Sequence, residues 1–249
     1  MKWDMRKQIV IGMLGIWVVM ASSSAHAGLM LRKTRIIYQQ GDKVQSISLQ
    51  NSGAEVYLVQ AAVTSWDNPN TRSSEFTVLP PLFRMEGDSL NVMRVIRTGG
   101  DFPADRESLF RFRINAIPAK KTTDENKENS DGKQDEIGAS LSISLGMNIK
   151  LIYRPDKLPM TPEQARGRLT FTRTGNSVVV TNPTPYYQTF AQLKLDGKAV
   201  DFDKAPSILA PFGQTTLPLA GKVGGKVEWS MITDIGGVSK LQSGTLQAG

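Results

Sequence analysis

The sequence contains no cysteine, and its one histidine is His26. Without cysteine the fold cannot use disulfides, which are common in exported proteins, but a chain of 249 residues can rely on a hydrophobic core. Because we expect His26 to be removed with an N-terminal signal, the mature chain lacks the residues for Ser-His-Asp or Cys-His catalysis and for a His- or Cys-based zinc site. Paired carboxylates for glycoside hydrolysis remain a formal alternative, but no pair lies in an apolar setting. We therefore predict a protein that is not an enzyme and uses no cofactor or metal.

Long apolar runs are also scarce. The run from Ile9 to Met20 has twelve residues, whereas a membrane-spanning helix needs about 20. Basic residues precede this run, and Ala25-His26-Ala27 follows it as a small-x-small cleavage signal. This order predicts a cleaved secretory signal peptide over residues 1–27 and a mature chain without membrane insertion. An uncleaved anchor is the alternative.

The mature chain has only a modest excess of positive charge. Removal of residues 1–27 takes away three of the 30 Lys and Arg and one of the 23 Asp and Glu, which leaves a net charge of +5. This excess favours acidic partners, or it is simply a solvated surface. Export and the lack of an aromatic-basic binding motif argue against nucleic acid as a partner.

Helical patterns are few, and alternating apolar and polar residues are common. Such segments run from Val44 to Leu49, Val56 to Val63, Leu90 to Ile96 and Leu109 to Ile114. Short turn sequences separate them, which is typical of an all-β sandwich. In the second half, Gly175-Asn176 and Asp196-Gly197 predict hairpin turns, and Lys226 to Ile232 predicts a further strand.

Prolines divide the chain into two predicted β-sandwich domains. Pro155 and Pro159 stop strand pairing near the middle of the chain. We therefore predict a first domain over residues 28–153 and a second over residues 154–249. Within the first domain, residues 119–138 are charged and polar, so they cannot bury enough surface to offset their ordering entropy. They predict a long mobile loop that is either functional or merely disordered.

An unusually regular strand pattern follows this loop. In the segment 139–155, ASLSISLGMNIKLIYRP, apolar side chains fall at every second position: Leu141, Ile143, Leu145, Met147 and Ile149. This alternation predicts a strand with one apolar face. Taken alone, it favours an ordinary strand that buries this face in its own sandwich. A strand that offers the face to another protein is the alternative.

Five motifs occur in order along the chain. They are Thr34-Arg35, the PPLFRM of residues 80–85, the DRESLF of residues 105–110 with NAIP at 115–118, the IKLIYRP of residues 149–155, and the NPTPYY of residues 182–187. Together they resemble the periplasmic pilus-assembly chaperones, the PapD-like partners of outer-membrane ushers. The resemblance covers essentially the whole mature chain. It implies two immunoglobulin-like domains in a boomerang arrangement, a periplasmic location, and partners that are pilus or fimbrial subunits and an usher.

The resemblance also implies roles for particular residues. In this family the chaperone lends a strand to a subunit that lacks one, which is called donor-strand complementation. The donor residues here are Leu141, Ile143, Leu145 and Met147. Arg35 and Lys150 correspond to the pair that holds the C-terminal carboxylate of the subunit. Glu107, Arg154 and Asp234 correspond to an interdomain salt bridge, to which we assign an orienting role because exposed ion pairs add little stability.

Other expectations concern assembly and classification. An exposed apolar edge invites self-association, so we expect the free protein to cover it, by forming a homodimer or with the neighbouring loop. The loop is long, but it lacks the Cys pair that long-loop members typically carry, so the chain fits neither loop subclass cleanly. The alternative function is a structural fimbrial subunit or adhesin. Against it, the segment from Gly28 to Ile37 lacks an alternating donor extension and carries a basic cluster that includes Arg35.

Overall fold

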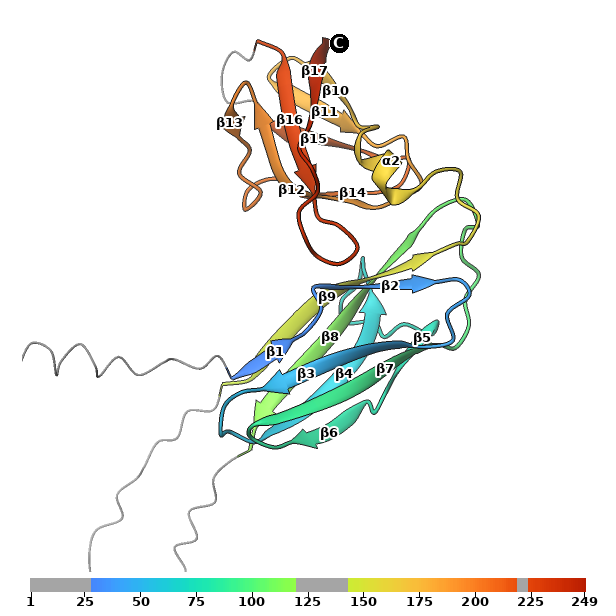
Figure 1. Ribbon diagram of the computed structural model, residues 1–249, viewed down its shortest axis with the longest axis vertical. Coiled ribbons are helices and arrows are strands. Elements are labelled where there is room, and N and C mark those ends of the chain that lie inside the picture. Colours follow the sequence, from blue (N-terminus) through green and yellow to red (C-terminus); the bar gives the residue numbers. More distant parts are fainter. Residues whose placement is uncertain (1–27, 120–142, 219–223) are drawn as a thin grey trace, which may run out of the picture.

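The computed structural model describes residues 28–119, 143–218 and 224–249 (Figure 1). The predicted signal peptide, Leu141 and residues 120–138 of the predicted loop lie outside these ranges. The described strands form two β domains, each with its own apolar core, so the predicted all-β architecture is confirmed. No helix in the described ranges is long and apolar enough to cross a membrane.

The first domain is a sandwich of two sheets. Its strands are β1 (Leu29–Leu31), β2 (Arg35–Gln39), β3 (Gln45–Asn51), β4 (Tyr57–Ser65), β5 (Phe76–Leu79), β6 (Leu82–Met85), β7 (Ser89–Arg97), β8 (Ser108–Pro118) and β9 (Leu145–Arg154). One sheet has the order β1-β3-β7-β5, and the other has the order β2-β9-β8-β4-β6. All the alternating segments singled out in the first half of the sequence lie within or largely overlap these strands.

The alternation determines which side chains face the core of the first domain. In β8, Phe112 and Ile114 are fully buried, whereas Arg113 between them is exposed. Aromatic rings of the first domain pack edge-on or tilted: Phe76 lies 5.2 Å from Tyr38, and Phe102 lies 4.2 Å from Tyr153. Such aromatic pairs add to the stability of the first domain beyond the area they bury.

Strand β9 has two different edges. Along one edge it pairs with β8 over its length, from Leu145 opposite Ala116 to Tyr153 opposite Ser108. Along the other edge it pairs with β2, in parallel, only from Lys150 onward. The strand before β2, β1, belongs to the opposite sheet, where it pairs with β3. Among the described residues, the stretch of β9 from Leu145 to Ile149 therefore has one edge without a neighbouring strand.

The second domain contains one short helix and eight strands in the described ranges. They are α2 (Pro162–Arg166), β10 (Thr170–Thr174), β11 (Ser177–Thr181), β12 (Gln188–Leu195), β13 (Lys198–Ala199), β14 (Ile208–Leu209), β15 (Gln214–Pro218), β16 (Lys226–Met231) and β17 (Gln242–Ala248). The strands pair in the order β13-β12-β16-β17-β10-β11-β15, with β14 on β12. Strand β17 joins the strands β13-β12-β16 to the strands β10-β11-β15, because it pairs antiparallel with β16 and parallel with β10.

Local sequence signals explain the turns of this domain. The hairpins predicted at Gly175-Asn176 and Asp196-Gly197 connect β10 to β11 and β12 to β13. Asp196 and Gly197 both have positive φ, as this type of tight turn requires. Helix α2 was not predicted, although Thr161 and Gln164 form a reciprocal capping box that marks its start.

Candidate functional site: the interdomain cleft and the edge of β9

Three charged residues from distant parts of the chain meet between the domains. Arg154, at the end of β9, donates from Nε to Glu107 Oε1 at 2.7 Å and from Nη1 to Asp234 Oδ2 at 2.6 Å. Glu107 and Arg154 are buried, and Asp234 is partly exposed on the loop after β16. The three residues of the predicted salt bridge are thus in direct contact.

Glu107 makes further contacts with the second domain. Its Oε2 accepts a hydrogen bond from the backbone N–H of Tyr187 at 2.7 Å, and its own N–H donates to the carbonyl of Pro185. Burial raises the pKa of Glu107 to about 7, against the opposing charge of Arg154. Burial opposes ionisation of Arg154 as well, but the hydrogen bond to Asp234 and the charge of Glu107 raise its pKa overall.

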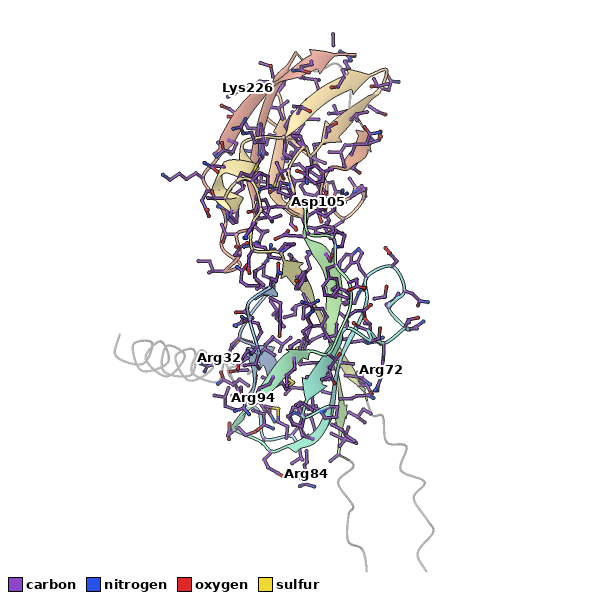
Figure 2. The ribbon with its side chains drawn as sticks, turned by 90° about the vertical axis from the view of Figure 1, so that its right-hand side faces the viewer. Arg32, Arg72, Arg84, Arg94, Asp105 and Lys226 are labelled. Atoms are coloured by element: carbon purple, nitrogen blue, oxygen red, sulfur yellow. The ribbon has the colours of Figure 1, made fainter. Side chains whose placement is uncertain are left out.

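The NPTPYY motif forms the wall that receives Glu107. The Asn182 amide donates to the carbonyls of Tyr186 and Ala210, both at 2.8 Å, and its Oδ1 accepts from the Thr184 hydroxyl. This buried network fixes the loop that presents Tyr187. Next to it, Arg106 of the DRESLF motif lies over the ring of Phe212, in the second domain, at 4.9 Å. Figure 2 shows the neighbouring Asp105 where the two domains meet.

The loop after β16 rests against the start of β2. Gly236, at φ 87°, is so close to Thr34 that an added Cβ would collide with the threonine hydroxyl. The same loop accepts a hydrogen bond at the carbonyl of Ile232 from Arg35 Nη1, at 3.3 Å. Asp234, between these positions, pairs with Arg154. The loop therefore connects the salt bridge to the predicted anchor residues.

Arg35 and Lys150 face each other on adjacent strands. They are direct partners in the β2–β9 register, so they mark the point where the open edge of β9 ends. Arg35 is only 8% exposed, and its Nε has no hydrogen-bond partner among the described residues. Burial lowers the pKa of Arg35, against the charges of Asp234 and Glu107. Burial, reinforced by the charge of Arg35, also lowers the pKa of Lys150. Two partly desolvated cations with spare donors form a suitable site for a carboxylate.

The predicted donor residues differ in their surroundings. Ile143 is 64% exposed and Leu145 is 39% exposed, so neither is covered by the described part of the chain. Met147 is half-buried and packs against the core of the first domain, as Ile149 does. Exposure thus falls along one face of the segment toward Lys150. Leu141 lies outside the described residues.

Some residues of the cleft were not predicted from the sequence. The small cleft beside Arg35, of about 20 Å³, is also lined by Arg166 from α2 and by Tyr186. The charge of Arg166 acts on Arg35, and the Tyr186 ring lies 5.1 Å from the Arg154 guanidinium. The capping box that starts α2 was the available signal for Arg166, although it gives no information on what the helix faces.

Comparisons with known proteins identify the family of this chain. Residues 28–159 match the model of the family described as pili and flagellar-assembly chaperone, PapD N-terminal domain. Residues 164–243 match the model for the C-terminal domain of the pili assembly chaperone PapD. The chain belongs to the PapD-like pilus-assembly chaperones. It is therefore a periplasmic chaperone of pilus assembly with no enzymatic activity, as the resemblance of its motifs implied.

The chaperone is similar to curated relatives over nearly its full length. It is 35% identical to the chaperone protein FocC of Escherichia coli over 244 residues, which cover 93% of this chain and 99% of the relative. It is 32% identical to the chaperone protein FimC of Escherichia coli strain K12, with 96% and 93% covered.

Solved structures of similar chaperones share the fold. The SafB chaperone of Salmonella enterica, solved in complex with the SafA pilin, is 35% identical, with a TM-score of 0.75 and 90% and 99% of the two chains covered. The Escherichia coli chaperone DraB is 33% identical, with a TM-score of 0.74 and 88% and 96% covered.

Proposed function

We propose that this chaperone binds a pilus subunit by lending it the open edge of β9, and that Arg35 and Lys150 hold the C-terminal carboxylate of the subunit. The observation that carries this proposal is the continuity of the two features. The edge from Leu145 to Ile149 has no neighbouring strand among the described residues, and it runs directly into the facing pair of cations. Strand addition to such an edge is a common mode of peptide recognition. The SafA pilin bound to the similar chaperone SafB is consistent with a client of this class.

The geometry predicts the direction of the bound strand. Arg35 begins β2, which runs parallel to β9 and occupies the same edge from Lys150 onward. A client strand on the free part of that edge must stop where β2 starts. If its carboxylate lies at Arg35 and Lys150, its C-terminus points the same way as β9. The client strand therefore runs parallel to β9, with its preceding residues beside Ile149 and Leu145.

Apolar side chains then provide most of the binding energy. Ile143 and Leu145 are exposed in the free chain and lie on the same face as Met147. Full burial of each exposed aliphatic side chain in a client groove contributes about 1.5–3 kcal/mol. Leu141 continues this pattern in the sequence and is proposed as a further donor. Met147 already packs on the core of the chaperone, so its contribution to the client is smaller.

Three further parts of the proposal concern the other contacts of the chaperone. Because an open strand edge with apolar side chains favours self-association, the free chaperone covers it by forming a homodimer.

The Glu107–Arg154–Asp234 contact sets the angle of the cleft rather than binding the client, since the Arg154 guanidinium is already paired with both carboxylates. The loaded chaperone then delivers the subunit to an outer-membrane usher.

Charge reversal tests the anchor directly. Arg35→Glu and Lys150→Glu are each expected to abolish co-purification of a pilin subunit that the wild-type chaperone captures on co-expression in the periplasm. Arg94→Glu is the matched control, because Arg94 is an exposed cation on β7 of the opposite sheet. It is expected to capture the subunit normally. Unchanged capture by both cleft variants, with a fold intact by circular dichroism, contradicts the assignment.

A further inference from the structure

The loop between β16 and β17 turns back on itself as a tight hairpin. The Thr233 N–H donates to the Gly237 carbonyl at 2.7 Å, and the Gly236 N–H donates to the Thr233 carbonyl at 2.9 Å. Gly236 has a φ of 87°, the left-handed conformation that typically ends a three-residue hairpin loop. We call residues 233–237 the hairpin tip. The hydrogen bonds give this tip a defined shape of its own.

The hairpin tip is attached to the first domain on both sides of its central residue. On one side, Asp234 Oδ2 accepts from Arg154 Nη1 at 2.6 Å. On the other side, Gly236 packs so closely against Thr34 that there is no room for a Cβ. The carbonyl just before the tip accepts from Arg35 Nη1 at 3.3 Å. The central residue is therefore held beside the start of β2, where Figure 1 shows this loop, in dark red, extending from the second domain toward β2 and β9.

Ile235 is this central residue, and the described part of the chain does not cover it. It is 95% exposed, the largest value among the bulky apolar side chains of that part. Single exposed apolar side chains are common on protein surfaces. Ile235, however, is held by contacts on both sides, so a client that buries it has little ordering of the loop to offset. Ile235 is thus positioned for a contact that its own fold does not make.

The hairpin tip lies on the outer side of the five-stranded sheet. Ile36 and Leu151 belong to the core of the first domain, so the residues that precede them, Arg35 and Lys150, point outward. Arg35 meets the hairpin on this side. A client strand beside β9 alternates in the same way. One of its last two side chains therefore points to the side on which the tip lies.

The hairpin tip also lies at the level where the client strand ends. Thr34 immediately precedes β2, and the start of β2 is the point at which the proposed client strand must stop. Gly236 contacts Thr34, and the Cα of Ile235 is one residue away, about 3.8 Å from the Cα of Gly236. The last residues of the client therefore lie within reach of the Ile235 side chain.

We propose that Ile235 packs against an apolar side chain at the last or the next-to-last residue of the client. This inference rests on the proposed function, because the client strand must end at Arg35 and Lys150. The second domain then makes a contact of its own with the client, and this contact favours clients whose last residues are apolar on that side. The Arg154–Asp234 pair supports the contact, since it holds one side of the hairpin tip.

Three synthetic peptides test this contact on the full chaperone. All three have alternating apolar residues and a free C-terminal carboxylate. One ends in two alanines, and the other two carry a leucine instead at the last or at the next-to-last position. For the wild-type chaperone we expect one of the leucine peptides to bind about fivefold more tightly than the alanine peptide, because its leucine is buried against Ile235.

Variants of the hairpin assign this gain to Ile235. Ile235→Ser should bind that leucine peptide no more tightly than the alanine peptide, whereas Ile235→Leu should keep the gain. Leu241→Ser is the matched control, because Leu241 is a 57% exposed apolar residue three positions beyond Val238, which closes the hairpin opposite Ile232. At about 3.3 Å per residue, Leu241 lies roughly 10 Å farther from the tip, so this variant should keep the gain. Circular dichroism checks the fold of each variant.

The outcomes separate this contact from the proposed function. If the wild type binds none of the peptides, or if Arg35→Glu binds them as the wild type does, the anchor is wrong and the contact falls with it. If the peptides bind but leucine gives no gain, or if Ile235→Ser keeps the gain or Leu241→Ser also loses it, the contact is wrong while the anchor stands. Self-association of the free chaperone that Ile235→Ser removes, with the leucine gain unchanged, assigns the tip to a second copy and also overturns the proposal.

Discussion

The two halves of β9 carry the same alternating pattern but have different surroundings. From Leu151 onward the inward-facing side chains are fully buried, and the strand has neighbours on both edges. From Leu145 to Ile149 the described part of the chain provides a neighbour on one edge only, and Leu145 is still 39% exposed. Alternation therefore identifies the apolar face of β9. The point at which β2 begins decides which part of that face is buried within the fold of the chaperone. The second half holds the strand in the fold, which leaves the first half available for the partner contact that we propose.

The largest expected effect is on the buried half. Leu151 is fully buried in the core of the first domain, so Leu151→Ala should lower the free energy of unfolding by about 2–5 kcal/mol through lost burial and the remaining cavity. Urea unfolding followed by circular dichroism measures this. A loss below that range would mean that the two halves of β9 are less different than the burial indicates.

Glu107, bound to Arg154 at the end of the buried half of β9, is expected to make the stability of the chaperone depend on pH. Glu107, which contacts Arg154, has a pKa of about 7 in the folded chain, against an ordinary value of 4.5. The folded state therefore holds this proton more tightly, so its contribution is largest below pH 4.5 and is lost as the pH rises through 7. The loss amounts to at most roughly 3 kcal/mol.

The isosteric variant Glu107→Gln isolates this contribution. Its free energy of unfolding should lack the decline that the wild type shows between pH 4.5 and pH values above 7. Comparison of urea unfolding curves for the two proteins over this range gives the difference. Parallel pH profiles would show that Glu107 stays ionised in the fold, with Arg154 fully offsetting the effect of burial.

The smallest expected effect on stability is in the open half. Ile143 and Leu145 are exposed, so Ile143→Ser and Leu145→Ser should change the free energy of unfolding by less than about 0.5 kcal/mol. The same variants should weaken capture of a pilin subunit markedly, because the lost side chains no longer fill its groove. Urea unfolding and co-purification, measured on the same preparations, check both parts. A large loss of stability would indicate that these side chains serve the fold of the chaperone.

The sequence predicted the positions of the strands better than their pairing with one another. Alternation and turn residues located β4, β7, β8 and β9 closely, and the five motifs identified the family. Strands β1, β2 and β17 were missed, because short or polar segments owe their structure to the strand beside them rather than to their own pattern. The same limit applies to the site. Arg35 and Lys150 were found by resemblance, but Arg166 was not, since the capping box of α2 does not show what the helix faces.

Amide hydrogen exchange along β9 tests the central claim most directly. The measurement compares the free chaperone, diluted so that it is monomeric, with its complex with a pilin subunit. The account predicts that alternate amides from Ile143 to Ile149, those on the open edge, become protected only in the complex, while amides from Leu151 to Arg154 are protected in both states. Unchanged exchange from Ile143 to Ile149 in a complex that contains bound subunit would contradict it.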